Sequence, residues 1–255
     1  MDLASDRCVC LRKVEFSETS QILDLFSEKH GIVSVLAKGA HRVTKAGSGR
    51  FDGGIDLLDL GMGVFTDDPA RQLGQLTEWK LESGHPPLRR TLRGLRLAVY
   101  AAELISALIE THDPHPELFR QFVHLLDELA TPRLEQAMLA WQLDLLTASG
   151  HLPAFDACVG CGKQAGDSKT YFSPARGGIV CQNCEQAIPD RQWIDPRLVR
   201  LVQQIIRLSR DNGSRRLPQL TRVQTDPINR ILAEHVVYVI GRPLRAWPYV
   251  SNQGP

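Results

Sequence analysis

The sequence predicts a multidomain α+β protein, in which a small N-terminal β-barrel precedes a helical bundle with an inserted four-cysteine zinc element. Three observations lead to this prediction. Short segments rich in β-branched residues occupy the first third of the chain. Apolar residues at helical spacing dominate the remainder, and two Cys-x-x-Cys pairs interrupt them. We expect a barrel over 1–84, a helical domain over 85–255 and a zinc-binding insert over 155–188.

Five short segments are the expected strands of the barrel. Each combines partial alternation of apolar and polar residues with β-branched side chains. Gly31 ends a tight connection between the second and third segments, as a hairpin requires. Short strands joined by glycine-containing turns are typical of a closed or partly closed barrel. The segments are 8–16, 20–28, 31–39, 55–66 and 70–81.

Three helical segments follow, and two more lie beyond the cysteines. Pro116 and Pro132 lie at the start of the second and third, where proline is favoured, and Gly150 is the expected C-terminal cap of the third. The five segments are 88–112, 116–130, 132–150, about 195–211 and about 226–240. The apolar face expected for the first consists of Leu92, Leu95, Val99, Ala102 and Ile105.

Composition restricts the possible functions. A chain of 255 residues with 43% hydrophobic residues can form a substantial core. The net charge is +1 and the pI about 7.7, so a nucleic-acid surface must come from local charge clusters. There is no apolar run of about eighteen residues, and the N-terminus is acidic where a signal peptide is basic. We expect a cytoplasmic protein with no membrane partner, whose paired cysteines bind metal rather than form disulfides.

The two Cys-x-x-Cys pairs have the spacing of a zinc site. Each pair would form a tight knuckle, and four thiolates close a tetrahedral shell with no open position for water, which favours a structural ion. The stretch between the pairs, with "YFS" and "GGIV", is the expected hairpin of a zinc ribbon, and Gly160 and Gly162 would let backbone amides approach the sulfurs. Unliganded core cysteines and a redox or iron–sulfur site are the alternatives. The expected ligands of one Zn²⁺ are Cys158, Cys161, Cys181 and Cys184. Cys8 and Cys10, two apart in a strand, are expected to be barrel residues.

A zinc-dependent nucleobase deaminase is the enzymatic alternative. Such enzymes carry H-x-E followed by P-C-x-x-C, and the Glu is the general acid/base. This chain has His115 and Glu117 in that pattern, but Ala157 stands where the proline is expected, and a second Cys-x-x-Cys competes to complete the shell. Both residues also lie at a helix start, where the helix dipole alone favours an acid. The pattern therefore favours a protein that is not an enzyme.

Two clusters of basic residues are candidates for phosphate binding. The first is a glycine- and serine-rich loop without acidic residues, which holds Lys38, His41, Arg42, Lys45 and Arg50. The second lies at the start of the first helix and consists of Arg89, Arg90, Arg93 and Arg96. The helix dipole disfavours cations at this end, so a phosphate contact would explain why they are there. Arg89, Arg93 and Arg96 are expected on one helical face. The alternative for both clusters is a solvated surface.

Aromatic residues in the barrel are few. Phe16, Phe26 and Phe65 are expected in the core, whereas Phe51, beside Arg50, is the expected stacking residue. Weak stacking with a strong phosphate contribution predicts binding with little sequence preference and a steep salt dependence. An RNA-binding zinc-ribbon protein would share these features and is a further alternative.

Several blocks, taken in order, resemble the RecO family of bacterial recombination mediators and DNA repair proteins. Residues 11–43 contain the family's E-x-S, its HG turn and its KGA segment. The blocks "LLTASGHLPAFDACVGCG" and "YFSPARGGIVC" match the family's segments around the cysteines, and "GRPLRAWPYV" matches its closing segment. Ala246 and Trp247 depart from the pattern, because the family commonly has a serine there.

The resemblance implies an OB-fold barrel followed by a helical domain with a zinc element, and no enzymatic turnover. It implies binding of single- and double-stranded DNA, annealing of complementary strands, and a nucleoid-associated location. It also implies cooperation with the partner RecR in loading RecA onto DNA coated with single-strand-binding protein, whose acidic C-terminal tail the family binds. By position, Lys38, Arg42 and Lys45 match the family's basic segment, and the four paired cysteines match its zinc ligands.

Overall fold

The computed structural model describes residues 2–40, 51–52, 55–67, 73–166, 168–210 and 217–251. The chain forms two compact units, Met1–Ala130 and Thr131–Pro255. Within these ranges, the first combines the barrel with three α-helices, and the second combines four α-helices and one short 3-10 helix, Glu185–Ala187, with a small three-stranded sheet. No helix within the described ranges is both long and apolar enough to cross a membrane. The division into 1–84 and 85–255 stays a prediction.

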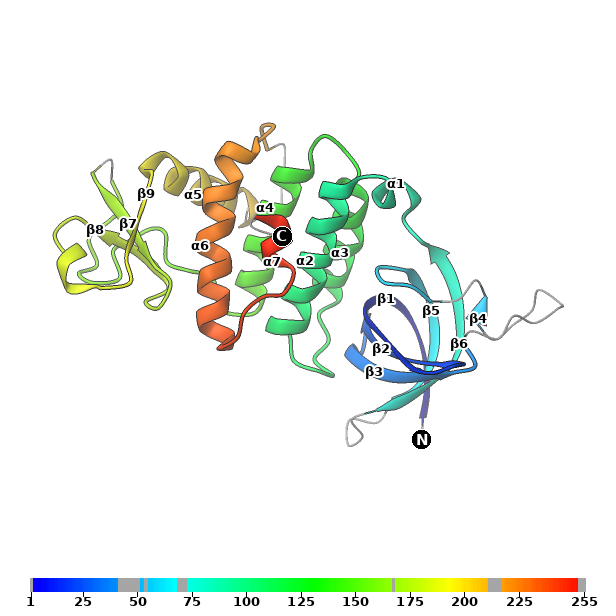
Figure 1. Ribbon diagram of the computed structural model, residues 1–255. Coiled ribbons are helices and arrows are strands. Elements are labelled where there is room, and N and C mark those ends of the chain that lie inside the picture. Colours follow the sequence, from blue (N-terminus) through cyan, green and yellow to red (C-terminus); the bar gives the residue numbers. More distant parts are fainter. Residues whose placement is uncertain are drawn as a thin grey trace. The chain divides into compact units, whose positions relative to one another are not determined.

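The barrel is built from five main strands, as the sequence predicts (Figure 1). They are β1 Asp2–Ser17, β2 Ser20–Ser27, β3 Gly31–Lys38, β5 Leu60–Asp67 and β6 Gly74–Ser83, and the two-residue β4, Phe51–Asp52, pairs with β6. The order is β3-β2-β1-β5-β6, and a parallel pairing of β3 with β6 closes the barrel. This is the barrel of an α+β fold with OB-type closure. β5 begins later than predicted because Leu58 has a positive φ of 68° in the turn before it.

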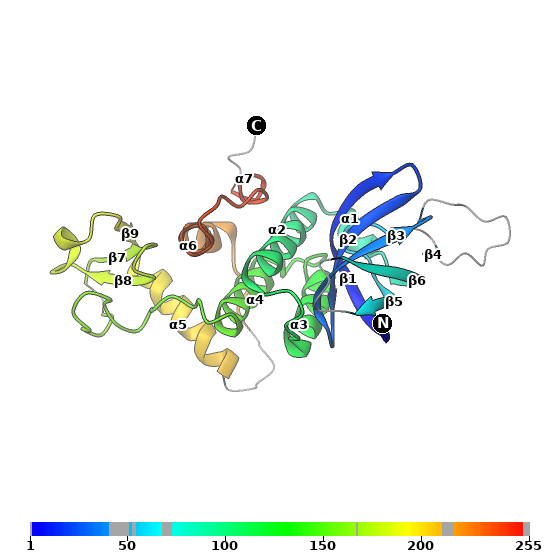
Figure 2. The ribbon, with the colours of Figure 1, turned by 90° about the horizontal axis from the view of Figure 1, so that it is seen from below.

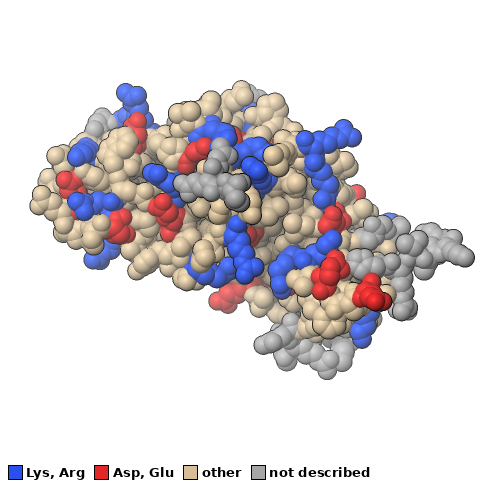
Figure 3. Space-filling model, viewed as in Figure 1, with Lys and Arg blue, Asp and Glu red and all other residues tan. Residues whose placement is uncertain are grey.

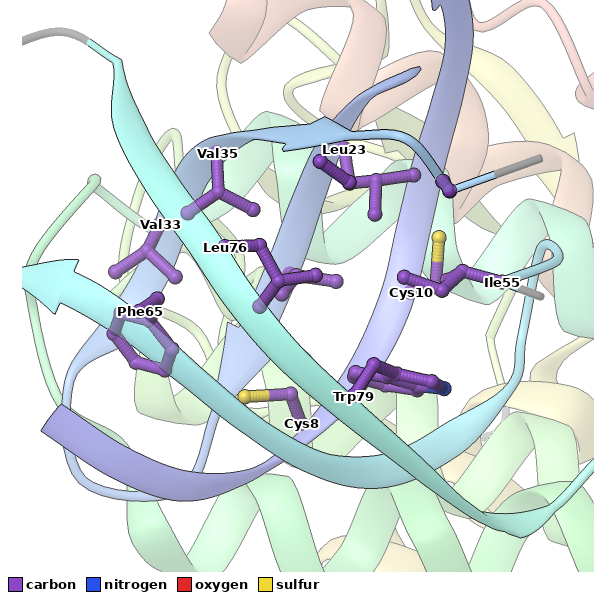
Figure 4. Packing of buried hydrophobic residues seen from close by; sticks show 12 residues of the cluster. Cys8, Cys10, Leu23, Val33, Val35, Ile55, Phe65, Leu76 and Trp79 are labelled. Carbon is purple, nitrogen blue, oxygen red and sulfur yellow. The ribbon is translucent and has the colours of Figure 1, made fainter. Parts of the chain in front are cut away.

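Alternate residues of the strands fill the barrel (Figure 4). Cys8 and Cys10 are fully buried core residues, as predicted, and burial raises the pKa of Cys10 to about 12, so its thiol stays protonated. Phe26 and Phe65 are also fully buried, as expected. The core side chains include Cys8, Cys10, Leu23, Val33, Val35, Ile55, Phe65, Leu76 and Trp79.

Two aromatic residues differ from expectation. Phe16 is 63% exposed rather than buried, because a register irregularity in β1 interrupts the alternation between Glu15 and Ser17. Phe51, the expected stacking residue, packs against the barrel core instead, and β4 places it beside Trp79 of β6. Phe16 is therefore exposed and Phe51 packs against the core, the reverse of what was expected.

The helices of the first unit are α1 Pro86–Arg89, α2 Leu92–Leu108 and α3 Pro116–Glu128. The predicted single helix over 88–112 is wrong, because Thr91 has an extended backbone that separates α1 from α2. Its expected apolar face is wrong at Leu92, which is 65% exposed, but Ala102 and Ile105 are buried as predicted. The buried residues also include Gly94, Leu97, Ala98, Ala101 and Leu104. Phe119 and Phe122 of α3 pack against Phe26 of β2, with ring centroids 5.6 and 6.5 Å apart.

The second unit begins with α4, Leu134–Ala148, which ends at Gly150 with a φ of 74°, as the predicted cap requires. Its sheet has the order β8-β7-β9, with β7 Thr170–Ser173, β8 Gly178–Cys181 and β9 Gln192–Ile194. The remaining helices are α5 Pro196–Arg210, α6 Arg222–Ile240 and α7 Trp247–Val250. α6 begins earlier than predicted because Thr221 and Gln224 form a capping box.

Candidate metal centre and nucleic-acid interface

Four cysteine sulfurs meet at one point of the second unit. Cys158 and Cys161 lie on the loop after α4, Cys181 ends β8, and Cys184 follows in the next turn. All four sulfurs lie within 4.8 Å of one another, and those of Cys161 and Cys181 are 3.7 Å apart. Tetrahedral zinc with Zn–S bonds of about 2.3 Å places its sulfurs about 3.8 Å apart. The sulfurs therefore have the spacing of a zinc shell, and all four cysteines are free of disulfides.

Backbone donors and neighbouring thiols control the ionisation of the cluster. Burial opposes ionisation of Cys158, but the N–H groups of Cys181 and Gly160 donate to its Sγ over 3.3 and 3.4 Å, and its pKa falls to about 6. Hydrogen bonding with the side chains of Cys161 and Cys181 raises the pKa of Cys184 to about 12. Four thiols this close cannot all ionise without a cation, and a bound metal ion would supply that charge. The residues present therefore fit a structural metal ion.

The glycines beside the cluster have different roles. A Cβ on Gly160 would lie 3.2 Å from the sulfur of Cys184, so this position favours glycine, and its amide approaches a sulfur as predicted. Gly162 instead supplies a turn with a φ of 74°, and its N–H donates to the carbonyl of Cys158. The first knuckle is thus shaped by one close approach and one left-handed residue.

The expected hairpin between the cysteine pairs is confirmed. β7 and β8 pair antiparallel, with Thr170 opposite Cys181. Asp190 fixes the turn between them, because its carboxylate accepts hydrogen bonds from the Ser173 hydroxyl and the Ala175 N–H, both over 2.8 Å. Burial opposes the ionisation of Asp190, but these donors lower its pKa. A rigid hairpin beside a closed four-sulfur shell is typical of a structural site.

The residues of the deaminase pattern are engaged elsewhere. His115 lies 2.9 Å from Asp113, and Glu117 accepts a hydrogen bond from Arg120 over 2.8 Å. All lie in the first unit and outside the cysteine cluster. In the part of the chain that the structure describes, the ligand atoms gathered at the cluster come from cysteines alone. Within the described residues, neither His115 nor Glu117 contributes an atom to the cluster, as the deaminase pattern would require of the histidine.

The predicted basic loop lies mostly outside the described residues. Lys38 is exposed at the end of β3, opposite Ser20 of β2. His41, Arg42, Lys45 and Arg50 fall in the segment that the structure does not describe. On the face seen in Figure 3, the described lysines and arginines are interspersed with acidic residues.

The second basic cluster does not form one helical face, because the break at Thr91 separates Arg89 from Arg93. The Arg89 guanidinium donates to the carbonyls of Gly84 and Leu57 and to the Asp59 carboxylate, over 2.6, 2.8 and 2.9 Å. It thereby ties the turn before β5 to the start of α1. Arg90 is exposed at the break, and Arg93 is half-buried on α2.

The second unit contains an apolar groove with cationic residues, none of which was predicted individually. It lies between β9, α5 and α6 and has a volume of about 560 Å³. Trp193, 57% exposed, and Val223, 84% exposed, contribute apolar surface, and Arg197 and Arg230 contribute positive charge. Trp193 is the residue that could have indicated the groove. The three residues of β9 are too few to show a strand pattern in the sequence. The apolar lining consists of Trp193, Ile194, Leu198, Leu201, Val223, Pro227 and Ile231.

Comparison with known proteins assigns the family. The model for the N-terminal part of recombination protein O matches residues 1–85, and that for its C-terminal part matches residues 89–248. DNA repair protein RecO of Rhodopirellula baltica is 36% identical over 179 residues, 69% of this chain and 65% of that protein. RecO of Anaeromyxobacter sp. strain Fw109-5 is 29% identical over 249 residues, 96% of this chain and 94% of that protein. The chain therefore belongs to the RecO family of DNA repair proteins, recombination mediators that are not enzymes.

Proposed function

We propose that this chain binds single- and double-stranded DNA, anneals complementary strands, and helps load RecA onto DNA coated with single-strand-binding protein, together with RecR. The observation that carries the proposal is a closed OB-type barrel whose β3 leads at Lys38 into a segment rich in basic residues and free of acidic ones. Barrels of this type bind oligonucleotides on the face of their second and third strands. Family membership over nearly the whole chain supports the same function.

Binding would rest on the phosphate backbone. Each lysine or arginine that neutralises a phosphate releases counterions, so affinity falls as salt rises. Annealing follows if two strands are held at once, because neutralised phosphates repel each other less, and no bond is made or broken. Arg89 would support the surface by holding its neighbours in place through Asp59. The proposed contacts are Lys38, His41, Arg42, Lys45, Arg50, Arg90 and Arg93. Arg89, whose guanidinium is held by three hydrogen bonds within the protein, is a positioning residue rather than a contact.

One Zn²⁺ ion would be held by the four cysteines and would stabilise the fold of the second unit. Its role there is to fix the two knuckles and the β7–β8 hairpin relative to one another. The protein would act in the cytoplasm, associated with the nucleoid.

The groove between β9, α5 and α6 is the proposed site for the C-terminal tail of single-strand-binding protein. A tail that is both acidic and apolar needs an apolar floor with a cation nearby. Trp193 and Leu198 would supply the floor, and Arg197 and Arg230 would pair with the acidic groups.

A fluorescence strand-annealing assay with single-strand-binding protein present, repeated across salt concentrations, tests the function. Reversing the charge of Lys38, Arg42 and Lys45 to Glu should slow annealing and weaken DNA binding. Loss of three phosphate contacts should reduce the log–log salt slope by about 2 for single strands. Reversal of Lys163, Arg176 and Arg191, which are exposed in the second unit, is the charge-matched control. Unchanged affinity and slope in the first variant would refute the loop as the binding surface, and a preference for RNA would favour the RNA-binding alternative.

A further inference from the structure

The hairpin between β1 and β2 ends in an unusually exposed aromatic ring. Phe16 is 63% exposed, the most exposed aromatic side chain that the structure describes in the barrel. Figure 2 shows this hairpin, in blue, reaching beyond the neighbouring strands. Nothing in the barrel core requires Phe16, since the core is already filled by residues such as Phe65 and Trp79.

A β-bulge directs this ring away from the barrel. Glu15 pairs with Gln21 and Ser17 pairs with Ser20, which leaves Phe16 as the extra residue of β1. Bulges re-aim a side chain and occur frequently beside binding sites. The other irregularity of β1 lies at Leu11, which is only 5% exposed. The same backbone device thus buries one apolar side chain of β1 and exposes the other.

The hairpin that carries Phe16 borders an open part of the outer barrel face. Val14, Ile22 and Leu36 face one another across β1, β2 and β3, and Val14 is 40% exposed. Because Ile22 and Phe26 are an even number of residues apart on β2, they share this outer face. At Phe26 the face is covered by Phe119 of α3, whereas at Ile22 it is only partly buried. One end of the face is therefore packed beneath a helix and the other is accessible.

Lys38 lies at the accessible end, beside a hairpin whose Glu15 and Glu18 are also exposed. Lys38 pairs with Ser20, which in turn pairs with Ser17, the neighbour of Phe16. Strands lie about 4.8 Å apart, so Lys38 and Ser17 are separated by about 10 Å at the backbone. Lys38 also shares the outer face with Leu36, while Val35 and Ala37 point into the barrel.

We propose that Phe16 stacks on a base of single-stranded nucleic acid whose backbone runs past Lys38. This inference rests on the DNA-binding function proposed above and adds the residue that distinguishes single strands from duplexes. An exposed ring can stack on any unpaired base, whatever its identity, and a neighbouring cation holds the phosphate. In a duplex the bases are already stacked and paired, so the ring gains no such contact. The first hairpin of an OB-type barrel and the face of its second and third strands are also where such barrels bind oligonucleotides.

The test compares Phe16→Ala with wild type on a single-stranded oligonucleotide and on a duplex of the same sequence. Phe16→Ala removes the stacking on one base, so the Kd for the single strand should rise about 5- to 150-fold. Affinity for the duplex should change less than about twofold. Phe16→Tyr should restore single-strand binding, and Leu3→Ala, which removes an equally exposed apolar side chain of β1, should leave it unchanged. The fluorescence of a 2-aminopurine base in the oligonucleotide changes when the base stacks on a ring. Among the three variants, only Phe16→Ala should abolish this change.

Other outcomes separate this inference from the proposed function. If Phe16→Ala binds both nucleic acids as wild type does, while charge reversal at Lys38, Arg42 and Lys45 weakens both, the stacking role is wrong and DNA binding stands. An equal loss for single strand and duplex also overturns it, because it points to the phosphate path or the fold. Reduced binding of RecR with unchanged DNA binding would assign the hairpin to a protein partner instead. If wild type binds neither nucleic acid, the proposed function itself fails.

Discussion

Replacing Arg89 with alanine should destabilise the first unit before it affects any DNA contact. The guanidinium donates three hydrogen bonds, one of them to Asp59, whose side chain is only 8% exposed. Burial already raises the pKa of the Asp59 carboxyl, and Arg89 is its cationic partner. Without that partner Asp59 keeps the N–H of Asp56, 2.7 Å away. A hydrogen bond to a charged group contributes about 1.5–3 kcal/mol, whereas water can replace Arg89 at the two carbonyls.

The expected loss for Arg89→Ala is therefore about 2–3 kcal/mol in the free energy of unfolding. Urea unfolding followed by circular dichroism measures it as a lower midpoint with an unchanged m-value. Arg90→Ala is the matched control: Arg90 is exposed, and its loss should change stability by less than about 0.5 kcal/mol.

A double-mutant cycle assigns the effect to the ion pair. In the Asp59→Asn background the cost of removing Arg89 should fall, because no buried carboxylate is then left without its cation. DNA affinity of Arg89→Ala, measured where the protein is still folded, should stay close to that of wild type. Unchanged stability together with a large loss of DNA affinity would refute this reasoning and make Arg89 a phosphate ligand.

Three further predictions concern the metal, the pH and the groove. Replacing Cys158 and Cys181 together with alanine should remove about one zinc per chain, measured by metal analysis, and expose the segment to protease; a metal-free native protein would contradict the site. Burial lowers the pKa of His85 below 6.5, so the unfolded state binds the proton first and stability should fall as pH drops below that value. The fall between pH 7 and pH 5 in urea midpoint should be smaller in His85→Asn; an equal fall would exclude His85. Trp193→Ala and Arg230→Glu should each weaken binding of an acidic tail peptide, by fluorescence anisotropy, at least several-fold, and unchanged anisotropy would place the peptide elsewhere.

Features encoded locally could be predicted from the sequence. The barrel strands follow from alternation, since each strand needs one apolar face, and Gly31, which has a φ of 70°, marks its hairpin. The four-cysteine cluster follows from two Cys-x-x-Cys pairs, because each pair brings two sulfurs together within a few residues. In both cases the informative residues are close together in the chain.

Features that depend on pairing or on distant elements could not be predicted. The exposure of Phe16 comes from an irregularity in the pairing of β1 with β2. The alternation of residues within β1 alone does not indicate where its pairing with another strand is irregular. The break at Thr91 has no proline or glycine to mark it. Arg89 reads as part of a basic cluster, yet its partner Asp59 lies thirty residues earlier. The groove needs three elements, one of which, β9, has only three residues.

The two proposed ligands are both anionic, but the structure suits them by different physical means. Along the barrel the contacts would be made with successive phosphates, so affinity should decline steeply with salt through counterion release. In the groove most of the lining is apolar, and burial of apolar surface is not screened by ions, so tail binding should decline more gently. Rising salt should therefore release DNA while the tail is still bound. A mediator of this kind would stay with single-strand-binding protein through its groove while its barrel exchanges strands.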